Sequence, residues 1–423
     1  MYLTLREVLS IKTSDALCIT VLALAMPIND ARVLMANYPY ALGMMCFFIA
    51  SFILAKSIYE LSSIRIRIII EILYFLSFTL NSNLVLYGGV LLYLAMNTKP
   101  SKYYKFLDFV LLPIVFFLIN KILFPVYGAY ENYNTVNLER IKWTLISLPQ
   151  ICGNIFASVM KLFSTDNLAL WIALTAFIIV FLIKGRLVLL GRKTVTLGNE
   201  WSSVLLFFFG WVIFIAGWFP YIVVRQNVSL SLTGIQGRDS MQIGIGLALI
   251  IYSITTKIFR EPLVVCIAVL GFFHFNTWYF NYQTEWYRQL AFQDQIKNVE
   301  DIYQGGNYIV NCSQPSPISD RRFYTWSGNT AAATGYRNAF MFNGEKDAVL
   351  LENQEAMTSV LSHYPMFSDY NYSTEINGIL DFEVDISNAD AVRIKKMELF
   401  DRNGFAKRIN EIGKITYTSN HAG

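Results

Sequence analysis

A chain of 423 residues that is 55% hydrophobic and only 15% charged is too apolar to be an ordinary soluble enzyme. Its charge is unevenly spread, since residues 1–280 carry about +9 and residues 281–423 about −5. We therefore expect an integral membrane protein, with a polytopic domain over 1–280 and a water-exposed domain over 281–423. The expected partner is the lipid bilayer, and we expect no binding of nucleic acid.

Apolar runs long enough to cross a hydrocarbon core of about 30 Å recur from Ala16 to Phe280. The segment Ile68–Met96 is long enough for a tight helical pair, broken near Asn81. Asp15–Met26 is the weakest candidate, because about a dozen residues at 1.5 Å each reach only part-way across. The pattern predicts an all-α membrane domain of about eight or nine transmembrane helices; the remaining candidates are 41–54, 106–123, 168–183, 204–224, 243–258 and 262–280.

Basic residues in short loops orient such helices, because these loops stay in the cytoplasm. Dense basic clusters lie at alternate ends of successive candidates, which predicts a multi-pass topology with a cytoplasmic N-terminus and an extracytoplasmic C-terminal domain. The sidedness of the tail does not depend on whether Asp15–Met26 spans. The clusters are Lys56/Arg65/Arg67, Lys99/Lys102/Lys105, Lys184/Arg186/Arg192/Lys193 and Lys257/Arg260.

The tail changes character after Phe280. Glu285–Ile302 places apolar residues at helical spacing, and Gln354–Ser362 reads as a short helix. Short strand-like runs follow Gly305 and Gly306, which together predict a small α+β domain. These runs are 308–310, 322–326, 379–386 and 391–400.

Asp30, followed by Arg32, stands in the first outward loop. A carboxylate there can act as a general base, or orient a divalent cation, beside a membrane-bound substrate, while Arg32 pairs with phosphate. The alternative is a solvated turn between two helices. No cofactor is firmly implied, and the spacing of the three histidines disfavours metal binding by histidine.

Arg225, Arg238 and Asp239 bracket the third outward loop, next to Tyr221. Two guanidiniums at headgroup depth can hold a phosphate or diphosphate, which makes these four residues candidates for binding a lipid-linked anion. Arginines near helix ends also extend to lipid phosphates without any function. Tyr221 equally suits interfacial anchoring.

Other polar residues have simpler explanations. Glu71 is expected to pair with Arg67, and Asp108 with Lys102 or Lys105. Gly244 and Gly246 lie inside an apolar run and predict close helix packing rather than nucleotide binding. The aromatic and amide side chains of 324–329 and 335–337 form either a sugar-contacting surface or a domain core.

With Asp30 in its first outward loop, Arg238 in a later one, and an outward C-terminal domain, the chain resembles the polytopic membrane glycosyltransferases of the GT-C type. The resemblance implies transfer of a sugar from a polyprenyl-phosphate donor to a glycan or lipid acceptor at the outer leaflet, in cell-envelope glycan assembly. It implies that Asp30 activates the acceptor and that arginines hold the lipid phosphate. The chain departs from the family in having a very small first outward loop without a second acidic residue. Residues 323–370 also resemble the tails of uncharacterised bacterial envelope membrane proteins.

Two other functions remain open. One is a non-catalytic scaffold, in which the membrane domain displays the tail to a partner. The other is a lipid or solute transporter, which the sparse intramembrane charge disfavours.

Overall fold

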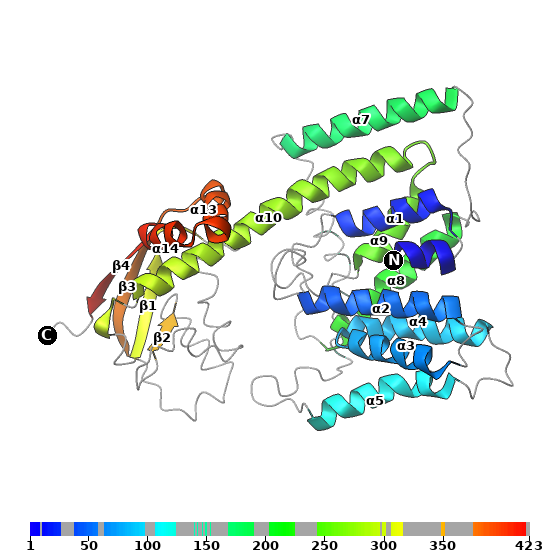
Figure 1. Cartoon of the computed structure of the whole chain (residues 1–423), viewed down its shortest axis with the longest axis horizontal. Coiled ribbons are helices and arrows are strands. Elements are labelled where there is room, and N and C mark those ends of the chain that lie inside the picture. Colours follow the sequence, from blue (N-terminus) through cyan, green and yellow to red (C-terminus); the bar gives the residue numbers. More distant parts are fainter. Residues whose placement is uncertain are drawn as a thin grey trace. The chain divides into compact units, whose positions relative to one another are not determined.

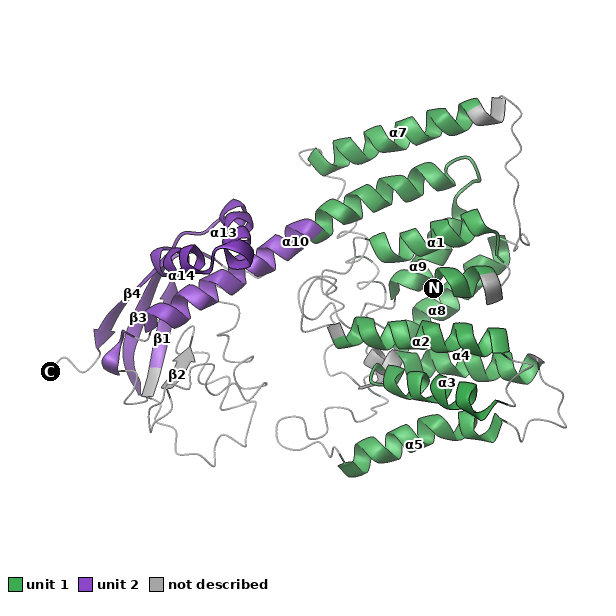
Figure 2. Ribbon diagram, in the orientation of Figure 1, with its two compact units in different colours: residues 1–126, 130–275 green, residues 127–129, 276–423 purple. Residues whose placement is uncertain are grey.

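A computed structural model describes residues 1–8, 11–26, 38–57, 63–97, 106–123, 168–189, 203–224, 243–296, 298–301, 306–315, 348–351 and 375–419, with single positions between 139 and 153. The chain divides into two compact units (Figure 2). Unit 1 comprises Met1–Val126 and Tyr130–Phe275, and unit 2 comprises Tyr127–Ala129 and Asn276–Gly423. The boundary expected from composition, at Asn281, lies a few residues inside unit 2.

Unit 1 is helical throughout its described part (Figure 1). The pair expected within Ile68–Met96 is confirmed as α3 and α4, and α4 begins at Asn81. The elements are the π-helix η1 (Thr4–Val8) and α-helices α1 (Thr13–Ala25), α2 (Tyr38–Ser57), α3 (Ile64–Ser77), α4 (Asn81–Asn97), α5 (Leu107–Leu123), α7 (Leu168–Leu189), α8 (Ser203–Val224), α9 (Ile243–Ile254) and the first part of α10 (Arg260–Ile296).

Glycine lets the backbones of these helices approach closely. A Cβ atom added to Gly246 of α9 would lie 2.5 Å from the backbone nitrogen of Phe214 in α8. One added to Gly210 of α8 would lie 3.0 Å from the carbonyl oxygen of Gly246. This is the small-residue packing by which apolar helices associate in a membrane, so the packing role expected for Gly246 is confirmed.

Three of the described helices are long and apolar enough to cross a membrane: Pro39–Ser57, Leu168–Arg186 and Arg260–Ile296. Shorter apolar helices accompany them at Thr13–Ala25, Asn83–Met96, Ser203–Gly217 and Ile243–Ile254. Large apolar side chains such as Phe117, Trp171 and Leu182 remain 58–65% exposed, which suits a lipid environment and not water.

Unit 2 contains a four-stranded sheet in the order β2-β1-β3-β4. β1 is parallel to β2 and to β3, and β4 is antiparallel to β3. Two helices, α13 and α14, connect β3 to β4 (Figure 1). The bounds are β1 (Gly306–Cys312), β2 (Ala348–Leu351), β3 (Ile376–Val384), α13 (Asn388–Phe400), α14 (Arg402–Glu411) and β4 (Gly413–Ser419).

The core of unit 2 lies between one face of this sheet and its helices. Alternate residues of β1 and β3 are buried, and they form one cluster with residues of α10, α13 and α14. In the centre, the ring of Phe292 meets that of Phe382 edge-to-face at 5.2 Å between centroids. The buried strand residues are Tyr308, Val310, Cys312, Leu380, Phe382 and Val384.

The structure confirms two expected strands in the tail, as β1 and β3. The prediction of a strand over 391–400 is wrong, because this segment belongs to the helix α13. Ser387 and Asp390 form a capping box at its start, which satisfies backbone N–H groups that a strand would pair differently. The expected helices 262–280 and 285–302 are not separate elements, since α10 is continuous to Ile296. The runs 322–326 and 354–362 lie outside the described residues.

Candidate functional site

The residues to which sequence assigned chemistry are outside the described part of the chain. This applies to Asp30, Arg32, Arg225, Arg238 and Asp239. Tyr221 belongs to α8, but its side chain is also not described. Their roles remain predictions.

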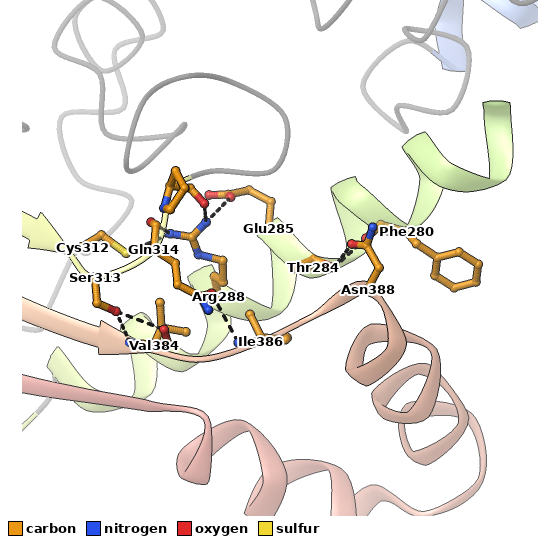
Figure 3. Close-up of polar contacts among 11 residues, drawn as sticks. Phe280, Thr284, Glu285, Arg288, Cys312, Ser313, Gln314, Val384, Ile386 and Asn388 are labelled. Carbon is orange, nitrogen blue, oxygen red and sulfur yellow. Dashed lines mark hydrogen bonds and ion pairs between the residues drawn. The ribbon is translucent and has the colours of Figure 1, made fainter. Parts of the chain in front are cut away.

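Unit 2 contains a group of buried polar side chains where α10 meets the end of β1. The sequence did not predict this group. Arg288 and Glu285 of α10 are 1% and 2% exposed, and Arg288 Nη1 lies 3.2 Å from Glu285 Oε2 (Figure 3). Removing two charges from water costs several kcal/mol per ion, so such a pair persists only where further hydrogen bonds complete it. The signal in the sequence was an acid and a base three positions apart within an apolar helical stretch.

Three further hydrogen bonds of Arg288 reach the chain at the end of β1. Nη2 donates to the carbonyl oxygen of Gln314 at 2.6 Å and to Sγ of Cys312 at 2.9 Å. Nη1 donates to the carbonyl oxygen of Pro315 at 2.8 Å. One guanidinium thus holds three residues at and just beyond the end of β1, and a charged donor makes each bond stronger than a neutral one.

Side chains also extend the pairing of β1 with β3 beyond the strands (Figure 3). Ser313 Oγ donates to the carbonyl oxygen of Val384 at 3.0 Å and accepts from its N–H at 2.8 Å. Gln314 Nε2 donates to Asp385 Oδ1 at 3.0 Å, and Gln314 Oε1 accepts from the Ile386 N–H at 3.4 Å. The carboxyl ends of the two parallel strands are therefore fixed together by polar side chains.

This cluster lies at the carboxyl ends of two neighbouring parallel strands, β1 and β3. The chain leaves β1 for β2 on one side, and β3 lies on the other side of β1. In open parallel sheets, ligands bind outside the carboxyl ends of strands where connections diverge in this way. The connection that begins after Pro315 includes the aromatic segments 324–329 and 335–337, which lie outside the described residues. We call the residues Ser313, Gln314 and Asp385 the carboxyl edge.

A second ionic cluster, in unit 1, joins α3 to α5. Arg67 Nε lies 3.3 Å from Glu71 Oε1, which confirms the expected pairing. Asp108 also pairs with Arg67, through both guanidinium nitrogens Nε and Nη2. Lys102 and Lys105 lie outside the described residues, so the expected pairing of Asp108 with one of them stays a prediction. All three residues are occupied with one another, which is typical of a structural role.

A third polar group joins α7, α8, α9 and α10. Arg260 donates to the carbonyl oxygen of Thr255 and to the hydroxyl of Tyr252, both at 3.0 Å, and to Ser203 Oγ at 3.3 Å. Its guanidinium also lies 4.2 Å from the centroid of the Tyr252 ring. Lys184 of α7 forms an ion pair with Glu261. These contacts fix the turn between α9 and α10 at a basic end of the helices.

Within the described residues, no group of three or more His, Cys, Asp or Glu side chains could hold a metal ion. The described cysteines, Cys18, Cys46, Cys266 and Cys312, are free thiols. No protein-family model, no curated protein and no solved structure matches this chain.

Proposed function

We propose that this chain is a multi-pass membrane glycosyltransferase of cell-envelope glycan assembly, which uses a polyprenyl-phosphate-linked sugar at the outer leaflet. In this proposal eight or nine helices span the membrane, and unit 2 lies outside the cytoplasm. The support for sidedness is the alternation of basic clusters along the sequence. Three described helices are long and apolar enough to span.

The observation that carries the proposal is the continuity of α10. Its N-terminal part is an apolar span, and its C-terminal part supplies Tyr287, Ala291, Phe292 and Ile296 to the core of unit 2. A helix that runs without a break from the bilayer into a folded domain holds that domain at the membrane surface. A domain so held suits a reaction between a lipid-linked donor and an acceptor at the same surface.

In the proposed reaction, Asp30 removes the proton from the acceptor hydroxyl as that oxygen attacks the anomeric carbon of the sugar. The bond from that carbon to the phosphate oxygen breaks, and Arg238, with Arg225, holds the departing lipid phosphate. In this proposal, Arg32, Asp239 and Tyr221 also bind the substrate on the outward side. In addition, the carboxyl edge offers amide, carboxylate and hydroxyl groups to hydroxyls of a glycan, at the ends of parallel strands where ligands commonly bind.

The test compares sugar transfer by Asp30→Asn with transfer by Glu411→Gln. The first replaces the proposed base with a side chain of the same size, and we expect a loss of at least 100-fold in kcat. Glu411 lies at the end of α14, its side chain is 49% exposed, and its loss should leave transfer unchanged. Full activity of Asp30→Asn would exclude the proposed base.

A scaffold is the second candidate, and one observation favours it. The polar pair of Arg288 with Glu285 is buried, and Arg288 holds the backbone carbonyl groups of Gln314 and Pro315. Such a group stabilises a displayed surface and does not itself react. For a scaffold, deletion of residues 283–423 removes all function, whereas Asp30→Asn and Arg238→Gln have no effect.

A further inference from the structure

One side of α13 exposes apolar and basic side chains together. Val392, Leu399 and Phe400 are 37%, 63% and 86% exposed. Arg393 and Lys396 are also exposed. At 3.6 residues per turn, Val392, Lys396 and Leu399 lie within about 60° of one another, and Phe400 and Arg393 come next around the helix. A single exposed apolar residue is ordinary, but three beside two cations form an amphipathic surface.

Hydrogen bonds attach both ends of α13 to one short stretch of α10. Asn388 Nδ2 donates to Asn281 Oδ1 at 2.7 Å, and Asn388 Oδ1 accepts from Thr284 Oγ1 at 2.8 Å (Figure 3). Near the other end, the Tyr287 hydroxyl donates to Glu398 Oε2 at 3.0 Å. The helix α13 is thus tied to α10 over residues 281–287.

This stretch begins where the apolar part of α10 ends, at Phe280. With a rise of 1.5 Å per residue, Thr284 lies about 6 Å and Tyr287 about 10 Å farther along the helix. The headgroup region on one side of a bilayer is about 5–8 Å thick. Trp278 and Tyr279 just before this point are the residue types that mark a membrane interface. Attachment at 281–287 therefore places the start of α13 within the headgroup region and its end, near Tyr287, at the outer edge of that region.

The contacts of α13 also show which flank is directed toward the apolar part of α10. Glu398 raises the pKa of Lys395 through a hydrogen bond of 2.8 Å, and the nearby Tyr279 adds to this effect. On the other flank, Asp390 lies 3.9 Å from Arg408 of α14. Leu399 follows Lys395 by one turn, so it lies on the Tyr279 flank.

We infer that α13 docks on the membrane surface, with Leu399 and Phe400 among the lipid headgroups and with Arg393 and Lys396 bound to phosphates of anionic lipids. This inference rests on the membrane insertion of α10 that the proposed function includes. The docked helix fixes unit 2 against the bilayer from a second point, in addition to α10. Apolar insertion combined with basic residues is the chemistry by which interfacial helices bind anionic membranes.

The experiment places a nitroxide at Phe400→Cys in the full-length protein, in nanodiscs of phosphatidylcholine and phosphatidylglycerol. The matched control is Lys407→Cys in α14, where the native side chain is 80% exposed. Power saturation measures collisions of the label with oxygen, which concentrates in lipid, and with a water-soluble nickel chelate. The same treatment of the wild-type protein gives the signal of native cysteines, which is subtracted.

For a docked α13, the label at 400 collides with the nickel chelate several-fold less often than the label at 407, and more often with oxygen. A label at Leu399→Cys behaves like that at 400. Replacing both Arg393 and Lys396 by Gln raises access of the nickel chelate in discs containing phosphatidylglycerol. Equal access of the chelate at 399, 400 and 407 overturns the inference.

Extraction with alkaline carbonate separates this result from failure of the proposed function. If carbonate releases the chain from membranes, neither α10 nor any other helix spans, and both proposals are overturned. If the chain stays in the membrane but position 400 is in water, only the docking of α13 is excluded. Docking does not depend on sugar transfer, so inactivity of the protein leaves this measurement valid.

Discussion

Arg288 donates a 2.6 Å hydrogen bond to the carbonyl oxygen of Gln314, just beyond the end of β1. A buried guanidinium on α10 therefore determines where the chain leaves the sheet. Gln314 in turn binds Asp385 at the end of β3. These two contacts lead from α10, which we propose spans the membrane, to the carboxyl edge, which we propose contacts a glycan.

Replacing Arg288 by Met should destabilise unit 2 by about 3–5 kcal/mol, because Glu285 is left buried without its guanidinium partner. Hydrogen exchange of the β1 and β3 amides in the full-length protein measures the loss. The double variant Glu285→Leu with Arg288→Met should recover most of it. Arg402→Met, at the exposed start of α14, is the control. Unchanged exchange in Arg288→Met would show that the buried pair does not stabilise the unit.

The start of α13 should lose stability in acid. Asp390 accepts hydrogen bonds from the hydroxyl and N–H of Ser387, and these lower the pKa of its carboxyl. A carboxyl with a lowered pKa stabilises the fold above its ordinary pKa of about 4, and the stabilisation disappears as the pH falls through the lowered value. Exchange of α13 amides, corrected for intrinsic rates, should therefore accelerate below about pH 4.

The Asn variant of Asp390 provides the control for this pH dependence. Its α13 amides should exchange faster than those of the wild type at pH 6, and acid should accelerate them less. Glu398 contributes in the same direction, since Lys395 lowers the pKa of its carboxyl. An Asp390→Asn variant with the full acid response of the wild type would contradict this origin.

Gly246→Ala should lower the thermal midpoint of the protein in detergent. A Cβ atom there would be 2.5 Å from backbone of α8, so the helices must separate, at a cost of about 1–3 kcal/mol. Gly89→Ala is the matched control, because a Cβ atom at Gly89 of α4 meets nothing within 4 Å. We expect it to be neutral or to stabilise by up to about 1 kcal/mol. Equal effects of the two substitutions would exclude close α8–α9 packing.

Arg67→Ala should destabilise unit 1 by about 1–2 kcal/mol, because Asp108 and Glu71 lose their shared cation. The magnitude is below that of a fully buried pair, since these side chains are 22–35% exposed. Arg65→Ala, on the exposed side of α3, should have little effect. The measurement is the thermal midpoint of each variant in the same detergent. An unchanged midpoint for Arg67→Ala would show that these ion pairs do not stabilise unit 1.

Local sequence signals predicted much of the fold. The break at Asn81 between α3 and α4 follows from three polar residues inside an apolar run, and β1 and β3 follow from short apolar runs bounded by glycine or polar residues. The segment that became α13 was misread, because Val392, Ile394, Met397 and Leu399 resemble a strand. The decisive signal was the Ser387–Asp390 capping box at its start.

The candidate site depends on contacts that no local pattern contains. Arg288 meets Gln314 across 26 positions of sequence, and Ser313 meets Val384 across 71. Charge and spacing give each residue many partners of suitable chemistry, and only the packing of helices and strands selects one. For the same reason, the buried pair Glu285–Arg288 was not among the residues that the sequence singled out.

Sugar transfer by the purified full-length protein in nanodiscs tests the central claim most directly. The donors are polyprenyl-phosphate-linked hexoses and pentoses with a radiolabelled sugar, and the acceptors are glycolipids extracted from the envelope of the producing cells. We predict donor-dependent incorporation of label that Asp30→Asn abolishes and Glu411→Gln retains. Absence of incorporation with every donor, from a protein whose unit 2 shows protected amides, would contradict a glycosyltransferase and favour the scaffold.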